Sequence, residues 1–263
     1  MISFLYPQSV LEPRTPDEMF SEEAQAMKAV GRSIHLIDTE ALDSGPSRIR
    51  PPFEPGARVA YRGWMLTHGE YVNLAASVER AGGFCSASPK KYVTTHHLPN
   101  WYAVAKDYTP ETVFLDTDAD LTSELRRLGW EKFFVKDHVK SLKTSVGSII
   151  EDPAQIETVV SEMEKYRGFI EGGLCIRRVE EFIAGSERRY FVLNQTPYAA
   201  EPGEAIPEPV AFCAGAIASP FFSVDVARRA DGVERIVEIG DGQVSDLVGW
   251  SVERFVDIWR DTE

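Results

Sequence analysis

The first 118 residues alternate short apolar runs with segments of helical periodicity. The apolar runs span residues 2–6, 33–38 and 58–64, and loops rich in proline and glycine separate them. Residues 16–30 and 71–80 carry apolar side chains at helical spacing, and glycines end both segments. Strands that alternate with helices predict βαβ units and a parallel sheet. We therefore expect a small α/β domain over residues 1–118.

Two details of this domain follow from its prolines. Pro16 suits the first turn of a helix, which makes Thr15 the expected N-cap. Residues 88–107 read as helix in pieces, and we expect the break at Pro99.

Composition excludes several classes of protein. The chain has 263 residues with 43% hydrophobic content, enough to bury a core. A net charge of -13 disfavours binding to nucleic acid or an anionic membrane, and no apolar run is long enough to span a bilayer. Three widely spaced cysteines fit reduced core thiols, so the expected location is the cytoplasm.

From residue 119 onward the pattern changes to α+β with mainly antiparallel strands. The expected strands are 130–136, 174–183, 189–193, 221–227 and 234–239. Helices are expected over 153–167 and 207–219, and an Asp-Gly turn joins the last two strands into a hairpin.

Two carboxylates of this hairpin lie within otherwise apolar strands. Asp225 and Glu238 can come close if the strands pair, and Asp241 follows the second strand. Hard oxygen ligands of this kind suit Mg²⁺. The alternative is that Asp225 and Glu238 simply alternate outward on a half-exposed hairpin.

Basic residues suggest phosphate contacts. Lys136 ends a strand, and Lys140 and Lys143 follow in a loop of small hydroxyl residues and glycine. Such a loop is able to hold a polyphosphate, or it is a solvated basic loop, because it lacks the Walker A spacing. Arg188 and Arg189 begin a later strand, and we expect Arg189 to face the site.

Two further features have weaker functional signals. Arg62 ends a strand beside Gly63 and Trp64, where it either holds a substrate carboxylate or forms an ordinary ion pair. His96 and His97 are adjacent, so on a helix their side chains diverge by about 100° and make a poor joint site. We expect both histidines to be structural, with contact between His97 and a substrate as the alternative.

The order of these parts resembles the ATP-grasp superfamily, specifically its clade of small proteins named for an arginine and two lysines. The resemblance covers residues 119–263. It is carried, in order, by a Phe-Val-Lys strand, a polar loop, a helix, Val-Glu-Glu-Phe-Ile, Glu-Arg-Arg-Tyr, an Asp-bearing strand and Val-Glu-Ile-Gly-Asp-Gly-Gln. It implies an ATP-grasp fold, in which two α+β subdomains (119–185 and 186–263) clasp ATP, preceded by a pre-ATP-grasp domain over 1–118.

The resemblance also implies roles for particular residues. Those expected to contact ATP are Lys136, Lys140, Lys143, Glu180, Glu181, Phe182, Ile183 and Arg189, with Lys136 and Arg189 also catalytic. The implied Mg²⁺ ligands are Asp225, Glu238 and Asp241. Many family members have Glu-x-Asn where this chain has Gly240, so the third ligand is either Asp241 or absent. Arg62 would hold the acceptor substrate.

The implied reaction is ATP-dependent ligation of a carboxylate to an amine or a related nucleophile. It proceeds through an acylphosphate and releases ADP and phosphate. The alternatives are phosphoryl transfer to a hydroxyl or a nucleic-acid end, and a non-catalytic nucleotide-binding module. The substrate and the oligomeric state do not follow from the sequence.

Overall fold

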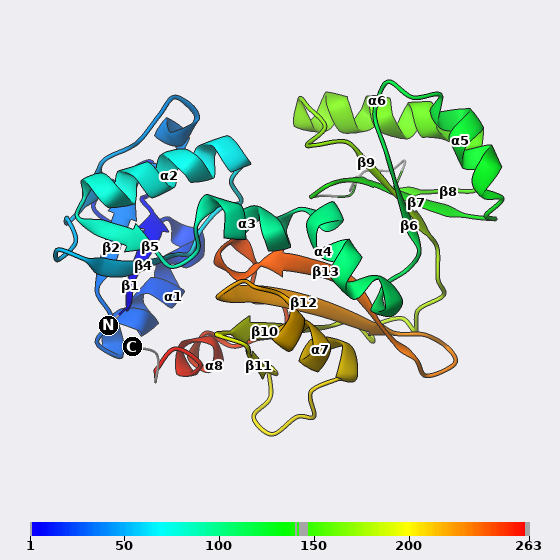
Figure 1. Ribbon diagram of the computed structural model, residues 1–263. Coiled ribbons are helices and arrows are strands. Elements are labelled where there is room, and N and C mark those ends of the chain that lie inside the picture. The colour runs from blue at the N-terminus through cyan, green and yellow to red at the C-terminus, as the bar shows by residue number, and fades with distance from the viewer. Residues whose placement is uncertain (1, 140, 142–146, 261–263) are drawn as a thin grey trace. The chain divides into compact units, whose positions relative to one another are not determined.

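A computed structural model describes residues 2–139, 141 and 147–260 (Figure 1). The chain forms two compact units. The first joins Met1–Thr95 to Arg188–Val224 and Gly240–Glu263, and the second joins His96–Glu187 to Asp225–Ile239. The expected boundary after residue 118 falls inside the second unit, so the division into two family domains stays a prediction.

The N-terminal part of the first unit is built on a five-stranded sheet of order β3-β2-β1-β4-β5. Its strands are β1 (Ile2–Pro7), β2 (Ile34–Ile37), β3 (Ile49–Arg50), β4 (Ala57–Tyr61) and β5 (Gly83–Cys85). β1 pairs in parallel with β2 and β4, and β4 with β5, while the short β3 is antiparallel. The expected parallel sheet is therefore confirmed.

Side-chain alternation along β1 explains how helices cover this sheet. Phe4 packs in a core cluster with Ala24 and Met27 of α1 (Glu18–Ala29). Leu5 points the other way and packs with Leu74 of α2 (His68–Arg80). Because successive strand residues face opposite sides, α1 and α2 cover opposite faces of the sheet (Figure 1). The 3-10 turn η1 (Glu40–Asp43) and α3 (Pro89–His96) complete this part.

C-terminal segments complete the first unit. A four-stranded sheet has the order β11-β10-β12-β13, and residues 225–228 of β12 and 234–239 of β13 belong to the second unit. Its strands are β10 (Arg188–Leu193), β11 (Thr196–Tyr198), β12 (Phe221–Arg228) and β13 (Glu234–Asp241). The helical segments of this region are α7 (Glu208–Ala216), η4 (Gly242–Val244) and α8 (Val252–Asp257). Phe255 of α8 belongs to the same core cluster as Phe4 and α1, so the end of the chain closes the core that its start begins.

The second unit contains a four-stranded antiparallel sheet of order β6-β9-β7-β8. Its strands are β6 (Thr112–Leu115), β7 (Phe133–Asp137), β8 (Ile149–Ile150) and β9 (Leu174–Arg178). Its helical segments are α4 (Leu98–Ala105), η2 (Lys106–Tyr108), α5 (Leu121–Leu128), η3 (Pro153–Gln155) and α6 (Ile156–Arg167). Leu125 of α5 and Val159 and Met163 of α6 pack on this sheet in one buried cluster.

Three local expectations were wrong. Asp17, rather than Thr15, caps α1, because its carboxylate accepts a hydrogen bond from the Met19 amide. The helical segment 88–107 breaks at His97 instead of Pro99, since proline is tolerated in the first turn of the helix that follows. β9 ends at Arg178, five residues before the expected end of its strand.

The cysteines agree with what the composition predicts. Cys85, Cys175 and Cys213 are free thiols, and burial raises the pKa of each to about 12. Among the described residues, no helix combines the length and the apolar character that crossing a bilayer requires.

Candidate functional site

An ion pair in the second unit joins two of the residues singled out from the sequence. The Nζ atom of Lys136 lies 2.9 Å from Oε1 of Glu238. Lys136 is held on β7, where it pairs in register with Cys175 of β9, and its side chain is only 6% exposed. Glu238 lies on β13 with its side chain 45% exposed. The lysine is therefore fixed by its strand, while the carboxylate reaches it from solvent.

Asp225 lies on β12, the strand next to β13 in the sheet. Its side chain is buried, with a relative exposure of 4%, so it does not alternate outward. The hairpin between the strands closes as predicted, because Arg229 N–H donates to Val233 O at 2.9 Å and Gly232 N–H donates to Arg229 O at 2.9 Å.

The segment after β9 is held by a double ion pair. Arg235 donates from Nε to Oε2 of Glu180 at 3.0 Å and from Nη2 to Oε1 at 2.9 Å. A fork of two parallel bonds of this kind fixes both groups in one plane. Arg229 lies 3.5 Å from the same carboxylate. Glu180 is thereby anchored to the hairpin of β12 and β13.

The three residues after Glu180 run beside the end of β12, where the hairpin turns. Glu181 is exposed, and Phe182 forms an isolated bridge with Arg229. Ile183 N–H donates to Arg228 O at 2.8 Å, and its side chain is 47% exposed. These residues lie beside the strand that carries Asp225.

Arg177 is a buried charge that the sequence reasoning missed. It lies on β9 and donates to Val237 O at 2.6 Å and to Thr109 Oγ1 at 2.5 Å. Burial lowers the pKa of Arg177 to about 10, and the nearby charge of Glu238 offsets part of this lowering. The sequence does contain a signal for it, since a charged residue stands two positions after Cys175 in a mainly apolar strand. Its bond to the Val237 carbonyl holds β13 immediately before Glu238.

Comparison with known families decides which fold carries this arrangement. The sequence model of an ATP-grasp domain, family 3 of the clade named for an arginine and two lysines, matches residues 127–260, just over half of the chain. The chain belongs to this family. The ATP-grasp fold expected from the sequence is thus confirmed, and this member of the clade is an ATP-grasp enzyme.

Solved structures of similar fold are ligases. D-cycloserine synthetase DcsG has 13% identity and a TM-score of 0.64, with 98% of each chain covered. The macrocyclase MdnC from Microcystis aeruginosa MRC, bound with its precursor peptide MdnA, has 12% identity and a TM-score of 0.61, with 98% of this chain and 99% of that chain covered. The ATP-grasp ligase PsnB, in complex with a precursor variant, Mg and ADP, has 14% identity and a TM-score of 0.60, with coverage of 98% and 96%. No curated protein matches the sequence.

Arg189 and Asp241 of this ATP-grasp protein belong to the first unit. Arg189 donates from Nη1 to Asp246 O at 2.8 Å, and its own carbonyl accepts from Trp250 Nε1 at 2.9 Å. Of the two consecutive arginines, Arg189 is half-buried and Arg188 is exposed, and the expected contact of Arg189 with phosphate stays a prediction.

The Asp241 carboxylate is wholly buried and serves the fold of the first unit. Its Oδ1 accepts from the Gln243 amide N–H at 3.0 Å and from Gln243 Nε2 at 2.9 Å, and Oδ2 accepts from Thr95 Oγ1 at 3.2 Å. Burial raises its pKa to about 7, against the lowering effect of these bonds. This geometry favours a structural role over the expected metal role.

Arg62 is also buried within the first unit and bound on several sides. It forms a fork with Glu23, with Nε to Oε1 at 2.9 Å and Nη2 to Oε2 at 2.7 Å. Its Nη1 donates to Gly242 O at 2.5 Å and to Ser245 O at 2.9 Å, and the guanidinium lies 4.5 Å from the Phe255 ring centroid. At 2% exposure, Arg62 is placed to hold the core together, not to receive the carboxylate of a substrate.

Lys140 and Lys143 lie outside the described residues. Their expected phosphate contacts remain predictions.

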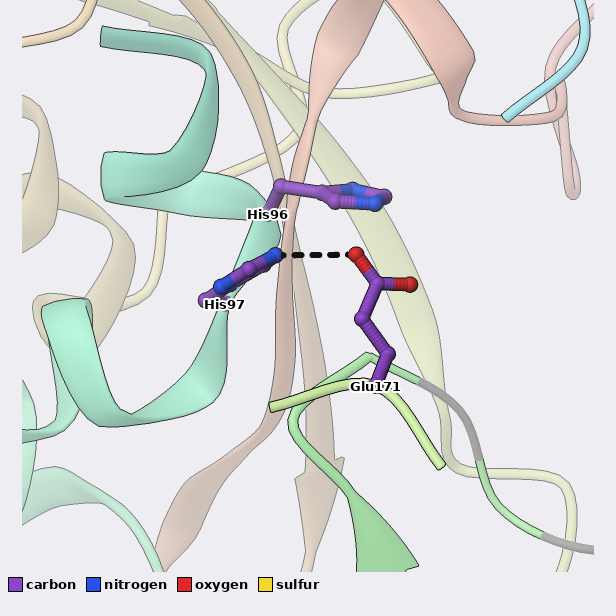
Figure 2. A group of neighbouring side chains, drawn as sticks. All are labelled: His96, His97 and Glu171. Atoms are coloured by element: carbon purple, nitrogen blue, oxygen red, sulfur yellow. Dashed lines mark hydrogen bonds and ion pairs between the residues drawn. The ribbon is translucent and has the colours of Figure 1, made fainter. Parts of the chain in front are cut away.

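The histidine pair differs from expectation. His96, His97 and Glu171 offer ligand atoms that all lie within 4.8 Å of one another, and Figure 2 shows their side chains converging. The rings of His96 and His97 do not diverge as on a helix, because His97 has left it, with φ −99° and ψ 122°. His138 lies nearby, with its ring centroid 6.0 Å from that of His97, and burial lowers its pKa.

Proposed function

We propose that this protein is a cytoplasmic, ATP- and Mg²⁺-dependent ligase that joins a carboxylate to an amine or a related nucleophile through an acylphosphate. The Lys136–Glu238 ion pair is the observation that carries the proposal. It places the expected phosphate-binding cation beside the expected metal-binding carboxylate, within a family whose fold binds ATP. The free cysteines support the cytoplasmic location.

The residues present fit a magnesium ion. Ser223 Oγ lies 3.2 Å from the position that a Cβ on Gly240 would take, so residues 223 and 240 face one another on one side of β12 and β13. Asp225 comes two residues after Ser223 and Glu238 comes two residues before Gly240, so both lie on that same side, because side chains alternate along a strand. Two carboxylates on neighbouring strands are the oxygen donors that Mg²⁺ prefers, with water and phosphate oxygens completing its shell. When bound, the ion neutralises charge on the phosphates of ATP.

The proposed reaction has two steps that balance in atoms. An oxygen of the substrate carboxylate attacks the γ-phosphorus of ATP, a P–O bond forms, and the bond to ADP breaks. The amine nitrogen then attacks the acyl carbon and loses a proton, and phosphate leaves with the oxygen that came from the carboxylate.

The protein's contribution to these steps is position and charge. Lys136 is fixed on β7 with a nearly buried ammonium, and a cation held away from water interacts strongly with phosphate oxygens. Arg189, Lys140 and Lys143 supply further positive charge to the phosphates in this proposal. Residues 180–183 line the base and ribose, where Arg235 keeps Glu180 in place.

A screen of pooled amino acids, peptides and other carboxylates tests this function. Substrate-dependent release of ADP and phosphate, followed by mass spectrometry of the new amide, is the expected result. ADP with a phosphorylated product and no free phosphate would instead indicate a phosphotransferase. ATP binding without Mg²⁺-dependent turnover would indicate a non-catalytic module.

Substitutions of the ion pair test the site. We expect Lys136→Ala and Glu238→Gln each to lower ADP release by at least about 100-fold, since removing one charge that stabilises a transition state costs about 10²–10³ in rate. Far-UV circular dichroism and thermal unfolding should stay close to wild type.

Lys132 and Glu151 provide a matched control in the same unit. They form an ion pair of 2.7 Å, but their side chains are 51% and 69% exposed. Lys132→Ala and Glu151→Gln should leave turnover unchanged. Wild-type turnover in Lys136→Ala, or equal losses in the control pair, would contradict the assignment.

A further inference from the structure

Two adjacent histidines and a glutamate converge in the second unit. His96 ends α3, His97 begins the turn into α4, and Glu171 lies in the loop before β9. Their three ligand atoms lie within 4.8 Å of one another (Figure 2). None of them belongs to the set assigned above to ATP or Mg²⁺.

An extended backbone conformation at His97 brings the two imidazoles together. Adjacent residues of a helix point in directions about 100° apart. His97 escapes this constraint because its φ and ψ of −99° and 122° are extended. The helix therefore breaks between two histidines whose ring centroids lie 5.6 Å apart.

The glutamate is positioned by backbone hydrogen bonds from the end of β7. Glu171 N–H donates to Oδ2 of Asp137 at 3.2 Å, and His138 N–H donates to Glu171 O at 3.2 Å. Leu98 N–H in turn donates to His138 O at 2.8 Å, which ties the α3–α4 junction to the same point. The three side chains thus extend from segments that are already fixed to one another.

The distances and burial suit a metal ion. Nε2 of His97 lies 3.1 Å from Oε1 of Glu171. Ligands about 2.0–2.1 Å from a tetrahedral zinc lie about 3.3 Å apart, close to this separation. The side chains of His97 and Glu171 are 18% and 14% exposed, so the ligands are partly withdrawn from water while an ion still has access. His96 is 5% exposed.

We propose that His96, His97 and Glu171 bind one divalent transition-metal ion of the zinc class. Imidazole nitrogen favours such ions, whereas the Asp225 and Glu238 carboxylates favour magnesium. Three protein ligands leave a fourth position for water or for a donor from a bound molecule. The ion would join the α3–α4 junction to the loop before β9.

Titration of the metal-free full chain with Co²⁺ tests this proposal. Co²⁺ binds to sites that bind zinc, and the visible absorption spectrum of bound Co²⁺ reports the type and number of its ligands. Excess Mg²⁺ in the buffer occupies carboxylate sites. We expect one Co²⁺ per chain, a spectrum typical of low coordination number, and displacement by an equivalent of Zn²⁺.

Variants assign the bound ion to residues. His97→Ala and Glu171→Gln should each weaken Co²⁺ binding by at least about 100-fold, because even residues that only orient metal ligands are worth about 10- to 100-fold. His68→Ala removes an exposed histidine of α2 and should bind as wild type. Glu238→Gln should also bind as wild type, which separates this site from the proposed magnesium site.

Each other outcome counts against the proposal. A wild-type chain that binds no Co²⁺ overturns it without any variant, so misfolding of a variant does not decide the matter. Unchanged binding in folded His97→Ala, or binding lost only in Glu238→Gln, also overturns it. In that case His97 and Glu171 form a simple ion pair.

Discussion

At the scale of single residues, burial decides what a charged side chain is able to do. Arg62 and Lys136 both come at the ends of strands. The sequence suggests a binding role for each, Arg62 for a substrate carboxylate and Lys136 for phosphate. Arg62 is enclosed by Glu23 and by two carbonyls of the C-terminal segment. Lys136 forms an ion pair with Glu238. The Glu238 side chain is half-exposed and is therefore able to exchange this partner for another. The sequence contains no signal for this difference, because Glu23 is 39 positions from Arg62.

Asp241 gives a prediction about pH. Burial raises its pKa from 3.8 to about 7. Between these values the folded chain holds a proton that the unfolded chain has lost, so the free energy of unfolding falls as pH rises through the window. Asp241→Asn removes this titration, while its amide oxygen still accepts the hydrogen bonds of Gln243.

The measurement is chemical denaturation of wild type and Asp241→Asn across that pH range. We expect the variant to gain stability relative to wild type as pH rises, because all other titrating groups are shared. A difference that is constant from about pH 4 to about 7 would show that the native carboxyl is ionised throughout. The variant should also keep its turnover far better than Glu238→Gln.

At the scale of elements, periodicity located most of the strands and helices but not their ends. β1, α1, α2, β10 and β12 were all expected within a few residues of their observed bounds. Short elements were missed, such as α5, whose eight residues give a period little room to appear. The convergence of the two histidines was missed for a related reason. Pro99 was expected to break the helix, but the break comes at His97. Because the His97 backbone is extended, its imidazole points toward the same region as that of His96.

The loop before β9 depends on a glycine. Gly172 has a φ of +78°, and a Cβ there would lie 2.2 Å from Nδ1 of His138. Gly168 has nearly the same φ, +79°, but open space around its Cβ position. Both alanine substitutions strain the backbone, by about 1–2 kcal/mol, because an L-residue in the left-handed conformation brings its Cβ too close to a carbonyl oxygen. Only Gly172→Ala must also displace the ring of His138, whose backbone N–H donates to Glu171 O.

We therefore expect Gly172→Ala to destabilise the chain by about 2–4 kcal/mol, combining backbone strain with overpacking. Gly168→Ala should cost about 1–2 kcal/mol, from backbone strain alone. Denaturant unfolding measures both. Co²⁺ titration of the folded variants should show weaker binding only for Gly172→Ala. Equal losses of stability in the two variants would mean that the contact with His138 is easily relieved.

At the scale of the whole molecule, the ordered set of motifs predicted the family, and the matched region confirms it. The compact units were not predictable from that order. The first unit draws together residues from the start, the middle and the end of the chain, because Phe4, Phe191 and Phe255 share one core. A boundary judged from a change of pattern near residue 119 cannot register contacts so distant in sequence.

The charged residues of the chain are unevenly distributed along the sequence. Residues 126–143 contain six basic and two acidic residues, whereas residues 230–263 contain three basic and nine acidic ones. The first segment includes Lys136 and the second includes Glu238. A net charge of -13 therefore conceals a basic segment suited to phosphate and an acidic one suited to a cation.

The most direct test of the ligase proposal uses an ¹⁸O-labelled carboxylate, taken from the acceptors that the screen identifies. Turnover through an acylphosphate must carry one oxygen of the carboxylate into the released phosphate. We predict one ¹⁸O atom in each phosphate, measured by mass spectrometry, with ADP formed in equal amount. Phosphate that contains no ¹⁸O, with amide formed at the normal rate, would contradict the mechanism.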